Sequence, residues 1–194
     1  GLPNVFTAYR VVSDDAARKS FEKAWDMKGL SPNPGMPVTV MLEKAHEGNL
    51  KSLFIIGENP LVSDPDLNHA RKALSNLELL VVQDIFLTET AQIADVVLPS
   101  FCFAEKEGTF TNSERRVQRV RKAVEAPEGT IQDWEIICGI ASRMGYTMDY
   151  KDSHEIFKEI SAVTPSYKGI TWDRIKYLGL HWPCPDEAHE GTPI

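Results

Sequence analysis

Hydrogen-bonding side chains follow two short apolar segments of the sequence, at the point where each segment ends. Ser52–Ile56 is followed by Asn59, and residues 79–82 are followed by Gln83 and Asp84. Ligands of open α/β sheets bind beyond the carboxyl ends of the strands. If both segments are strands of one parallel sheet, their polar side chains lie at the same edge. The sequence therefore predicts a site for a nucleotide-like group there.

The sequence gives little support for disulfides, metal sites or catalytic residues. The three cysteines, Cys102, Cys138 and Cys184, form no CxxC pair, so we expect reduced thiols rather than disulfides or an iron–sulfur cluster. His181 and His189 flank Cys184 with a spacing unlike zinc sites, and we expect a surface tail there. No Ser–His–Asp, paired-carboxylate or Walker-type arrangement stands out, so we assign no catalytic residue and no metal ligand to this chain.

Five basic residues lie close together in the sequence: Arg115, Arg116, Arg119, Arg121 and Lys122. They could bind phosphate, but we favour a solvated or subunit-facing edge strand, because charged edges prevent unwanted strand pairing. The net charge of −7 and the pI near 5.3 argue against nucleic-acid binding, which usually shows a basic domain.

The 194 residues suffice for one α/β domain with a sizeable core and a small helical extension. No apolar run approaches the length of a membrane helix, and the N-terminus shows no signal peptide. We expect a soluble, cytoplasmic chain without membrane contact, although a periplasmic or membrane-associated parent protein is compatible with the sequence. The chain begins without Met, so the absence of a targeting signal leaves the localisation of the intact protein open.

The first 49 residues are expected to form a helical extension. Ser13 is a plausible N-cap for a helix, since apolar residues follow it at helical spacing: Ala17, Phe21, Ala24 and Trp25. Residues 29–37 hold three prolines and two glycines and predict a loop. A second helix over residues 38–47 should end at Gly48.

Residues 50–180 are expected to form the main α/β domain. Strands are predicted over Ser52–Ile56, 79–82 and 95–98, with helices between them, one of which starts at Asp64 as cap and the other over residues 88–93. Uniformly apolar strands suit a parallel sheet covered by helices on both faces. The predicted fold class is therefore α/β, with a mostly parallel, Rossmann-like, doubly wound sheet and additional helices toward the C-terminus.

The remaining elements are less regular. Residues 105–122 predict an irregular loop or hairpin that lies over a site. Helices are expected over residues 134–144, with Asp133 as cap, from Asp152 to residue 162, and for a short stretch from Thr171. Residues 181–194 are expected to form an extended tail.

Several runs of residues match a known pattern. They are Gly57-Glu58-Asn59-Pro60, Val82-Gln83-Asp84 with Thr88, and Thr90-Ala91-Gln92-Ile93-Ala94-Asp95-Val96-Val97-Leu98-Pro99 followed by Glu105 and Glu107-Gly108-Thr109-Phe110. With these runs the sequence resembles the molybdopterin oxidoreductase family, and within it the large subunits of formate dehydrogenases. In such proteins this domain holds the guanosine end of one of two molybdopterin guanine dinucleotides.

The resemblance implies a role for residues of the first loop. Gly57 would let the backbone approach the cofactor closely, because it has no Cβ. Asn59 and Ser63 would hydrogen-bond ribose or guanine. Without the resemblance, residues 57–60 predict only a turn, with Gly and Asn present for backbone reasons.

The resemblance also implies a role for the ends of the second and third strands. Gln83 and Asp84 would contact the guanosine, and the Asp84 carboxylate could accept from N1 and N2 of guanine. Ser100 and Asp133 complete the cofactor-binding set, although Asp133 is equally plausible as a plain helix cap. Asp95 is expected to bind nearby backbone rather than the cofactor.

The cofactor implied for the full-length protein is bis-molybdopterin guanine dinucleotide with Mo or W. A 4Fe–4S cluster is implied for the parent but not for this chain, which lacks the cluster cysteines and the Cys or selenocysteine ligand of the metal. The chain alone should be inactive. Implied partners are the remaining domains of the large subunit and electron-transfer iron–sulfur subunits.

Two alternatives stay open. The first is a scaffold domain without the metal cofactor, as in the large iron–sulfur subunit of NADH dehydrogenases. The second is a free-standing nucleotide-binding module, although the sequence lacks a GxGxxG loop.

Overall fold

The computed structural model describes residues 2–193, which divide into two compact units. The parallel unit comprises Met36–Cys102 and Glu125–Thr147, and the antiparallel unit comprises the remaining described segments. The two units are defined by which segments pack together. The predicted division, into a helical extension up to residue 49, a binding domain over residues 50–180 and a tail from residue 181, is a division by function and stays a prediction. Gly1 and Ile194, at the ends of the predicted extension and tail, lie outside the described residues.

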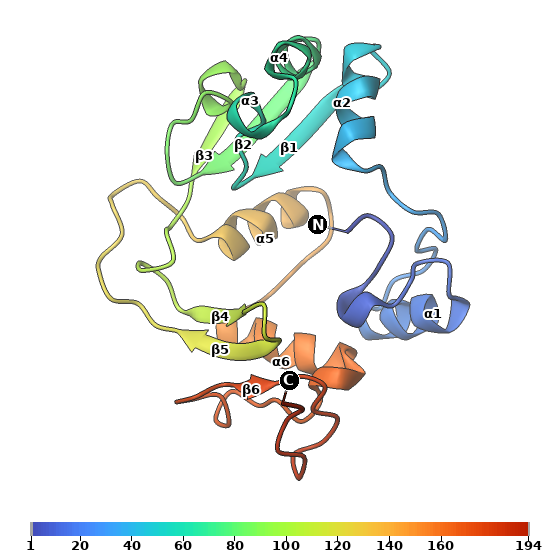
Figure 1. Cartoon of the computed structure of the whole chain (residues 1–194), viewed down its shortest axis with the longest axis vertical. Coiled ribbons are helices and arrows are strands. Elements are labelled where there is room, and N and C mark those ends of the chain that lie inside the picture. Colours follow the sequence, from blue (N-terminus) through green and yellow to red (C-terminus); the bar gives the residue numbers. More distant parts are fainter. Residues whose placement is uncertain (1, 194) are drawn as a thin grey trace. The chain divides into compact units, whose positions relative to one another are not determined.

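The parallel unit contains a three-stranded parallel sheet in the order β1-β2-β3 (Figure 1). The strands are β1 (Ser52–Ile56), β2 (Leu79–Asp84) and β3 (Val96–Pro99). All three were predicted, although β2 extends two residues further, to Asp84, and β3 lies one residue later than the predicted 95–98. With helices packed against this sheet, the predicted α/β class is confirmed.

Helices cover one face of the parallel sheet (Figure 1). They are α2 (Val38–His46), α3 (Pro60–Ser63) and α4 (Leu67–Ser75). Leu80 and Val82 of β2 point into the core that these helices form, because alternate residues of a strand face the same side. The core residues are Leu42, Ala45, Leu61, Ala70, Ala73, Leu74, Leu80, Val82 and Ala91.

The helix boundaries of the parallel unit correct three predictions. Asp64 does not cap a helix; α4 begins after Asp66, whose carboxylate accepts from His69 N at 3.0 Å. The predicted helix at residues 88–93 is only the 3₁₀ turn η2 (Ala91–Ile93). The N-cap of α5 (Asp133–Arg143) is Gln132 rather than Asp133. Several neighbouring polar residues can supply the same cap, and tertiary packing selects one.

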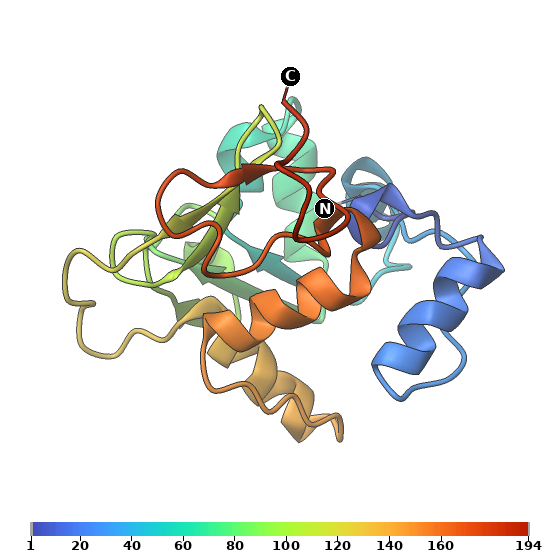
Figure 2. The same cartoon turned by 90° about the horizontal axis from the view of Figure 1, so that it is seen from below.

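The antiparallel unit contains the sheet β4-β5-β6. Its strands are β4 (Gly108–Thr111), β5 (Arg116–Val120) and β6 (Leu180–His181). Its helices are η1 (Thr7–Tyr9), α1 (Asp15–Ala24), α6 (Ser153–Val163) and η3 (Pro165–Tyr167). Helix α6 packs beside β4, η3 and α1 (Figure 2). The predicted hairpin at residues 105–122 is present as β4 and β5.

Four predictions for the antiparallel unit are wrong in detail. Asp14, not Ser13, caps α1, and its carboxylate accepts from Ala16 N at 2.9 Å. Thr171 begins a turn rather than a helix. Strand β5 is central in its sheet rather than an edge, because Leu180 of β6 pairs with Val117. The tail is not entirely on the surface, because the Cys184 side chain is fully buried.

Across residues 2–193, none of the helices is long and apolar enough to cross a membrane.

Candidate functional site

The carboxyl ends of the three parallel strands lie side by side. Ile56 of β1 pairs with Gln83 of β2, and Asp84 pairs with Pro99 of β3. Just beyond the strands, Gly57 N donates to the Gln83 carbonyl at 2.9 Å and Ser100 N donates to the Asp84 carbonyl at 3.1 Å. The predicted strand-end arrangement is therefore present, with Gly57, Gln83, Asp84 and Ser100 at one edge.

Gln83 is the most buried polar residue at this edge. Its side chain is fully buried, and its Nε2 donates to Asp133 Oδ1 at 2.8 Å. Within the described part of the chain, its Oε1 has no hydrogen-bond partner. A buried acceptor without a partner costs free energy, and native proteins rarely leave one unsatisfied. The Gln83 Oε1 atom is therefore a candidate acceptor for a ligand N–H or O–H group.

Backbone pairing brings the start of α5 to the same edge. Ile131 N donates to the Pro99 carbonyl at 3.1 Å, and Phe101 N donates to the Ile131 carbonyl at 3.3 Å. Ser100, which is 6% exposed, thus forms an isolated parallel β-bridge with Ile131. This pairing places Asp133, the first residue of α5, against Gln83.

The Asn59 side chain is engaged by the loop that follows β2. Its Oδ1 accepts from Thr90 N at 3.1 Å and from Thr90 Oγ1 at 2.7 Å. Its Nδ2 donates to Glu89 Oε2 at 2.7 Å. This donor lowers the pKa of Glu89 below its ordinary value, because it stabilises the carboxylate form. Asn59 therefore ties the two strand-end loops together, and one of the two N–H groups of its amide is used by Glu89.

Ser63 and Gly57 shape the first loop. The Ser63 hydroxyl donates to Glu58 Oε1 at 2.6 Å. Gly57 has a φ of +62°, and a Cβ there would meet no protein atom within 4 Å. Glycine is thus favoured by the left-handed backbone rather than by a crowded neighbour within the chain.

Asp84 supports the loop after β2 with one of its two carboxylate oxygens. Oδ1 accepts from Ile85 N at 2.7 Å and from Phe86 N at 3.3 Å. Among residues 2–193, no donor bonds its Oδ2. Because neighbouring strand residues point to opposite faces, Gln83 and Asp84 present their acceptors on different sides of the strand end.

The structure joins some predicted residues and separates others. Gln83 contacts Asp133, with Ser100 close by in the backbone ladder, whereas Asn59 and Ser63 bond to Glu89, Thr90 and Glu58. The sequence reasoning missed the roles of Glu89 and Thr90, although Thr90 opens the TAQIADVVLP run. As expected, Asp95 binds backbone: its Oδ2 accepts from Leu80 N at 2.7 Å.

Two of the five basic residues around β5, Arg119 and Arg121, are engaged within their own unit. Arg119 lies over the Trp172 ring at 4.0 Å and pairs with Glu107. Arg121 donates to the Lys176 carbonyl. These contacts favour a structural role over phosphate binding. In the part of the chain that the structure describes, no group of three or more His, Cys, Asp or Glu side chains could hold a metal ion.

The fold and the site define an α/β domain that presents polar groups at the carboxyl edge of a parallel sheet, where such folds bind cofactors. Residues 8–143 match the molybdopterin oxidoreductase family. The chain belongs to that family. The resemblance expected from the sequence runs is thus confirmed.

Relatives with known names agree with this assignment. The chain is 53% identical to the F420-dependent formate dehydrogenase subunit alpha of Methanocaldococcus jannaschii, over all of this chain and 28% of that protein. It is 42% identical to formate dehydrogenase H of Escherichia coli, over 98% of this chain and 27% of that protein. The chain therefore spans little more than a quarter of the length of these curated relatives.

A solved structure shares the fold. The acetylene hydratase of Pelobacter acetylenicus superposes with a TM-score of 0.58 at 24% sequence identity, over 84% of this chain and 23% of that one. At this identity the similarity shows the fold alone.

Proposed function

We propose that this chain is the part of a formate dehydrogenase large subunit that binds the guanosine end of a molybdopterin guanine dinucleotide. The observation that carries the proposal is Gln83, a fully buried amide at a strand end whose Oε1 lacks a partner within the described residues. The relatives support the enzyme class, since they are named as formate dehydrogenases and match 100% and 98% of this chain.

The residues fit a guanine base by their hydrogen-bonding types. The Asp84 carboxylate is an acceptor, and the Watson–Crick edge of guanine offers the N1–H and N2–H donors. Gln83 Oε1, on the other side of the strand end, would accept from a different donor of the guanosine, such as a ribose hydroxyl. Adenine presents one donor, at N6, beside an acceptor at N1, so it cannot offer a carboxylate the two adjacent N–H donors that guanine offers. A site built around acceptors rejects a ligand that lacks the matching N–H group. We therefore assign guanine rather than adenine to this edge.

The other residues would hold the rest of the guanosine diphosphate. Asp133 orients Gln83 through their 2.8 Å hydrogen bond. Ser100 offers a hydroxyl at the end of β3, and Asn59 and Ser63 would reach ribose. Gly57 permits close approach of the first loop. When bound, the Mo- or W-pterin centre would supply the two-electron oxidation of formate to carbon dioxide, while this chain binds and orients the cofactor.

The proposal extends to partners. The M. jannaschii relative is named as an alpha subunit, so we propose that the parent protein works with electron-transfer subunits that carry iron–sulfur clusters. The remaining domains of the large subunit would supply the metal ligand and the catalytic residues.

Asp84→Asn in the full-length protein tests the site. Asparagine keeps the Oδ1 acceptor for Ile85 N and Phe86 N but turns the free Oδ2 into a donor that faces guanine donors. We expect at least about a tenfold loss of acid-released guanine nucleotide per chain, with formate-dependent dye reduction falling in parallel.

Asp95→Asn is the matched control. Its carboxylate accepts a backbone N–H that an amide oxygen can also accept, so guanine content should stay unchanged. Full guanine content in Asp84→Asn would overturn the proposal. Micromolar binding of GDP by the 194-residue chain alone would instead favour a free-standing nucleotide-binding module.

A scaffold domain without the metal cofactor is the second candidate, because Asn59 is already engaged by Glu89 and Thr90. Metal analysis of the full-length protein separates the two candidates. Less than about one-tenth of a Mo or W atom per chain, in protein made with ample metal, would favour the scaffold.

A further inference from the structure

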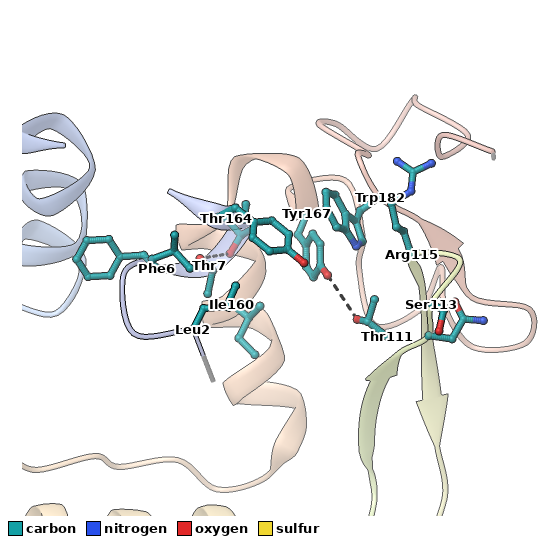
Figure 3. A pocket seen from close by; sticks show the side chains of 14 residues that line it. Leu2, Phe6, Thr7, Thr111, Ser113, Arg115, Ile160, Thr164, Tyr167 and Trp182 are labelled. Atoms are coloured by element: carbon teal, nitrogen blue, oxygen red, sulfur yellow. Dashed lines mark hydrogen bonds between the residues drawn. The ribbon is translucent and has the colours of Figure 1, made fainter. Parts of the chain in front are cut away.

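The antiparallel unit contains a pocket of about 640 Å³, a volume within the usual range for small-molecule sites. Its walls come from five segments: the N-terminal residues through η1, the turn between β4 and β5, the end of α6, η3, and the segment at β6 (Figure 3). None of the predicted cofactor-binding residues lines it.

Aromatic rings form much of one wall. The Trp182 ring lies 6.3 Å from the Tyr9 ring and 5.9 Å from the Tyr167 ring, measured between centroids. Figure 3 shows Tyr167 and Trp182 next to each other, with Arg115 beyond Trp182. Phe6 lines the pocket from another side and stacks on Phe21 at 4.4 Å. Flat rings at such spacing suit stacking with a planar ligand.

Among the described residues that line the pocket, Arg115 carries the single formal charge, because the others are apolar or neutral. The Arg115 guanidinium lies 5.8 Å from the Trp182 ring centroid. Over residues 2–193, no carboxylate pairs with Arg115; the neighbouring Glu114 lies 3.9 Å from Arg116 Nε instead. Burial raises the pKa of Tyr167, so its hydroxyl stays neutral. The pocket is therefore suited to an anion.

The backbone holds Arg115 in an uncommon conformation. Its φ is +65°, in the left-handed region that non-glycine residues rarely adopt. The turn is tied on both sides: Arg115 N donates to the Asn112 carbonyl at 3.0 Å, and its carbonyl accepts from Trp182 N at 3.1 Å. Ala8 and Tyr9, on the opposite segment of the lining, also have a φ of +58°. Such conformations persist where the surrounding structure fixes them, and they cluster at ligand sites.

We propose that this pocket binds a small planar aromatic molecule that carries an anionic group. The rings of Tyr9, Tyr167 and Trp182 contact the planar part, and the Arg115 guanidinium pairs with the anion. The hydroxyl of Ser113, which lines the pocket beside Arg115, offers an additional donor, whereas the Thr111 hydroxyl lies 3.4 Å from the Tyr167 hydroxyl and is hydrogen-bonded to it. Its lining residues all belong to the antiparallel unit, whereas the residues proposed to bind guanosine belong to the parallel unit.

Three probes separate the contributions of ring and charge. Flavin mononucleotide carries a planar ring and a phosphate, riboflavin carries the ring alone, and ribose 5-phosphate carries the phosphate without a ring. Calorimetry on the 194-residue chain should show flavin mononucleotide binding at least about tenfold more tightly than riboflavin, and riboflavin more tightly than ribose 5-phosphate.

Arg115→Gly assigns the charge preference to one residue. Glycine suits the positive φ, so the turn should be retained while the guanidinium is removed. We expect the affinity for flavin mononucleotide to fall to within about twofold of that for riboflavin, while the riboflavin affinity stays the same. Arg121→Met removes one charge outside the pocket lining and should change neither affinity. Trp182→Leu should weaken both ligands by about tenfold.

The proposal is overturned by any of three results. They are no binding of flavin mononucleotide at about 1 mM, equal affinities for the two flavins in the unaltered chain, or an equal loss in Arg115→Gly and Arg121→Met. Circular dichroism of each variant checks that it is folded. Because Asp84→Asn lies in the other unit, it should leave flavin binding unchanged, which keeps this test independent of the guanosine proposal.

Discussion

The two units hold their polar groups in different ways. At the strand ends of the parallel unit, polar side chains bond to one another, as Asn59 does to Thr90 and Gln83 to Asp133. Around the pocket of the antiparallel unit, neutral hydroxyls and aromatic rings surround one arginine. A hydrogen-bond network organises the first region, where Gln83 Oε1 and Asp84 Oδ2 have no partner among the described residues. The shape of the walls organises the second region.

This difference follows from how each backbone delivers its side chains. A parallel sheet places the ends of all its strands at one edge, so a few adjoining residues form a site. The pocket needs five segments that are distant in sequence. We therefore expect the strand-end site to respond to single hydrogen-bonding groups, and the pocket to respond to packing.

Phe21→Ala should have the largest effect and would test the role of packing. Phe21 is fully buried and its ring stacks on Phe6 at 4.4 Å and lies 4.8 Å from Trp25. Removing the ring should cost about 3–5 kcal/mol in the free energy of unfolding, measured in urea. Because Phe6 lines the pocket, the affinity for riboflavin should fall as well.

Leu80→Ala provides the matched change in the parallel unit. Leu80 is 2% exposed and belongs to the core beneath the helices, so a cost of about 2–5 kcal/mol is expected. Riboflavin affinity of the folded variant should be unaltered, because Leu80 does not line the pocket. Equal losses of riboflavin affinity in both variants would contradict a pocket built by local aromatic packing.

Thr90→Val should have the next largest effect and would test the hydrogen-bond network. The Thr90 hydroxyl, which is fully buried, donates to Asn59 Oδ1 at 2.7 Å and accepts from Leu61 N at 3.2 Å. Valine keeps the shape but removes both bonds, so we expect a loss of about 2–3 kcal/mol in urea unfolding. Thr90→Ser keeps the hydroxyl and should lose only about 1 kcal/mol, for one methyl group. A similar cost for both variants would show that the hydroxyl contributes little.

The sequence predicted the parallel sheet well because its signals are local. Ser52–Ile56 and the strands that follow are apolar runs that end at polar residues. This pattern can be recognised in the sequence without knowing which tertiary contacts form. Helix starts were shifted by one or two residues, as at Ser13 and Asp64, because adjacent polar residues can cap equally well. Strand β6 was missed because two residues carry no periodicity.

The contacts of the candidate site could not be predicted in the same way. Gln83 and Asp133 are 50 residues apart, and Asn59 and Thr90 are 31 apart. Sequence patterns place such residues at strand or helix ends but do not state which side chains meet. The aromatic pocket gave no local signal, since Tyr9, Arg115 and Trp182 meet only after the chain has folded.

Glu89→Gln should have the smallest effect on stability. It tests whether a single exposed charge contributes to the hydrogen-bond network at the strand ends. The hydrogen bond from Asn59 lowers the pKa of Glu89 from its ordinary value of 4.5. A carboxyl whose pKa is lower in the folded state stabilises the protein above its unfolded pKa, and this stabilisation is lost as the pH falls through the folded pKa. The difference in Tm between the unaltered chain and Glu89→Gln should therefore be greatest near pH 7, decrease as the pH falls below the ordinary value of 4.5, and disappear once the pH is below the lowered pKa of the folded state. A difference that is constant between pH 7 and pH 3 would show that the Glu89 carboxylate does not stabilise the loop through its charge.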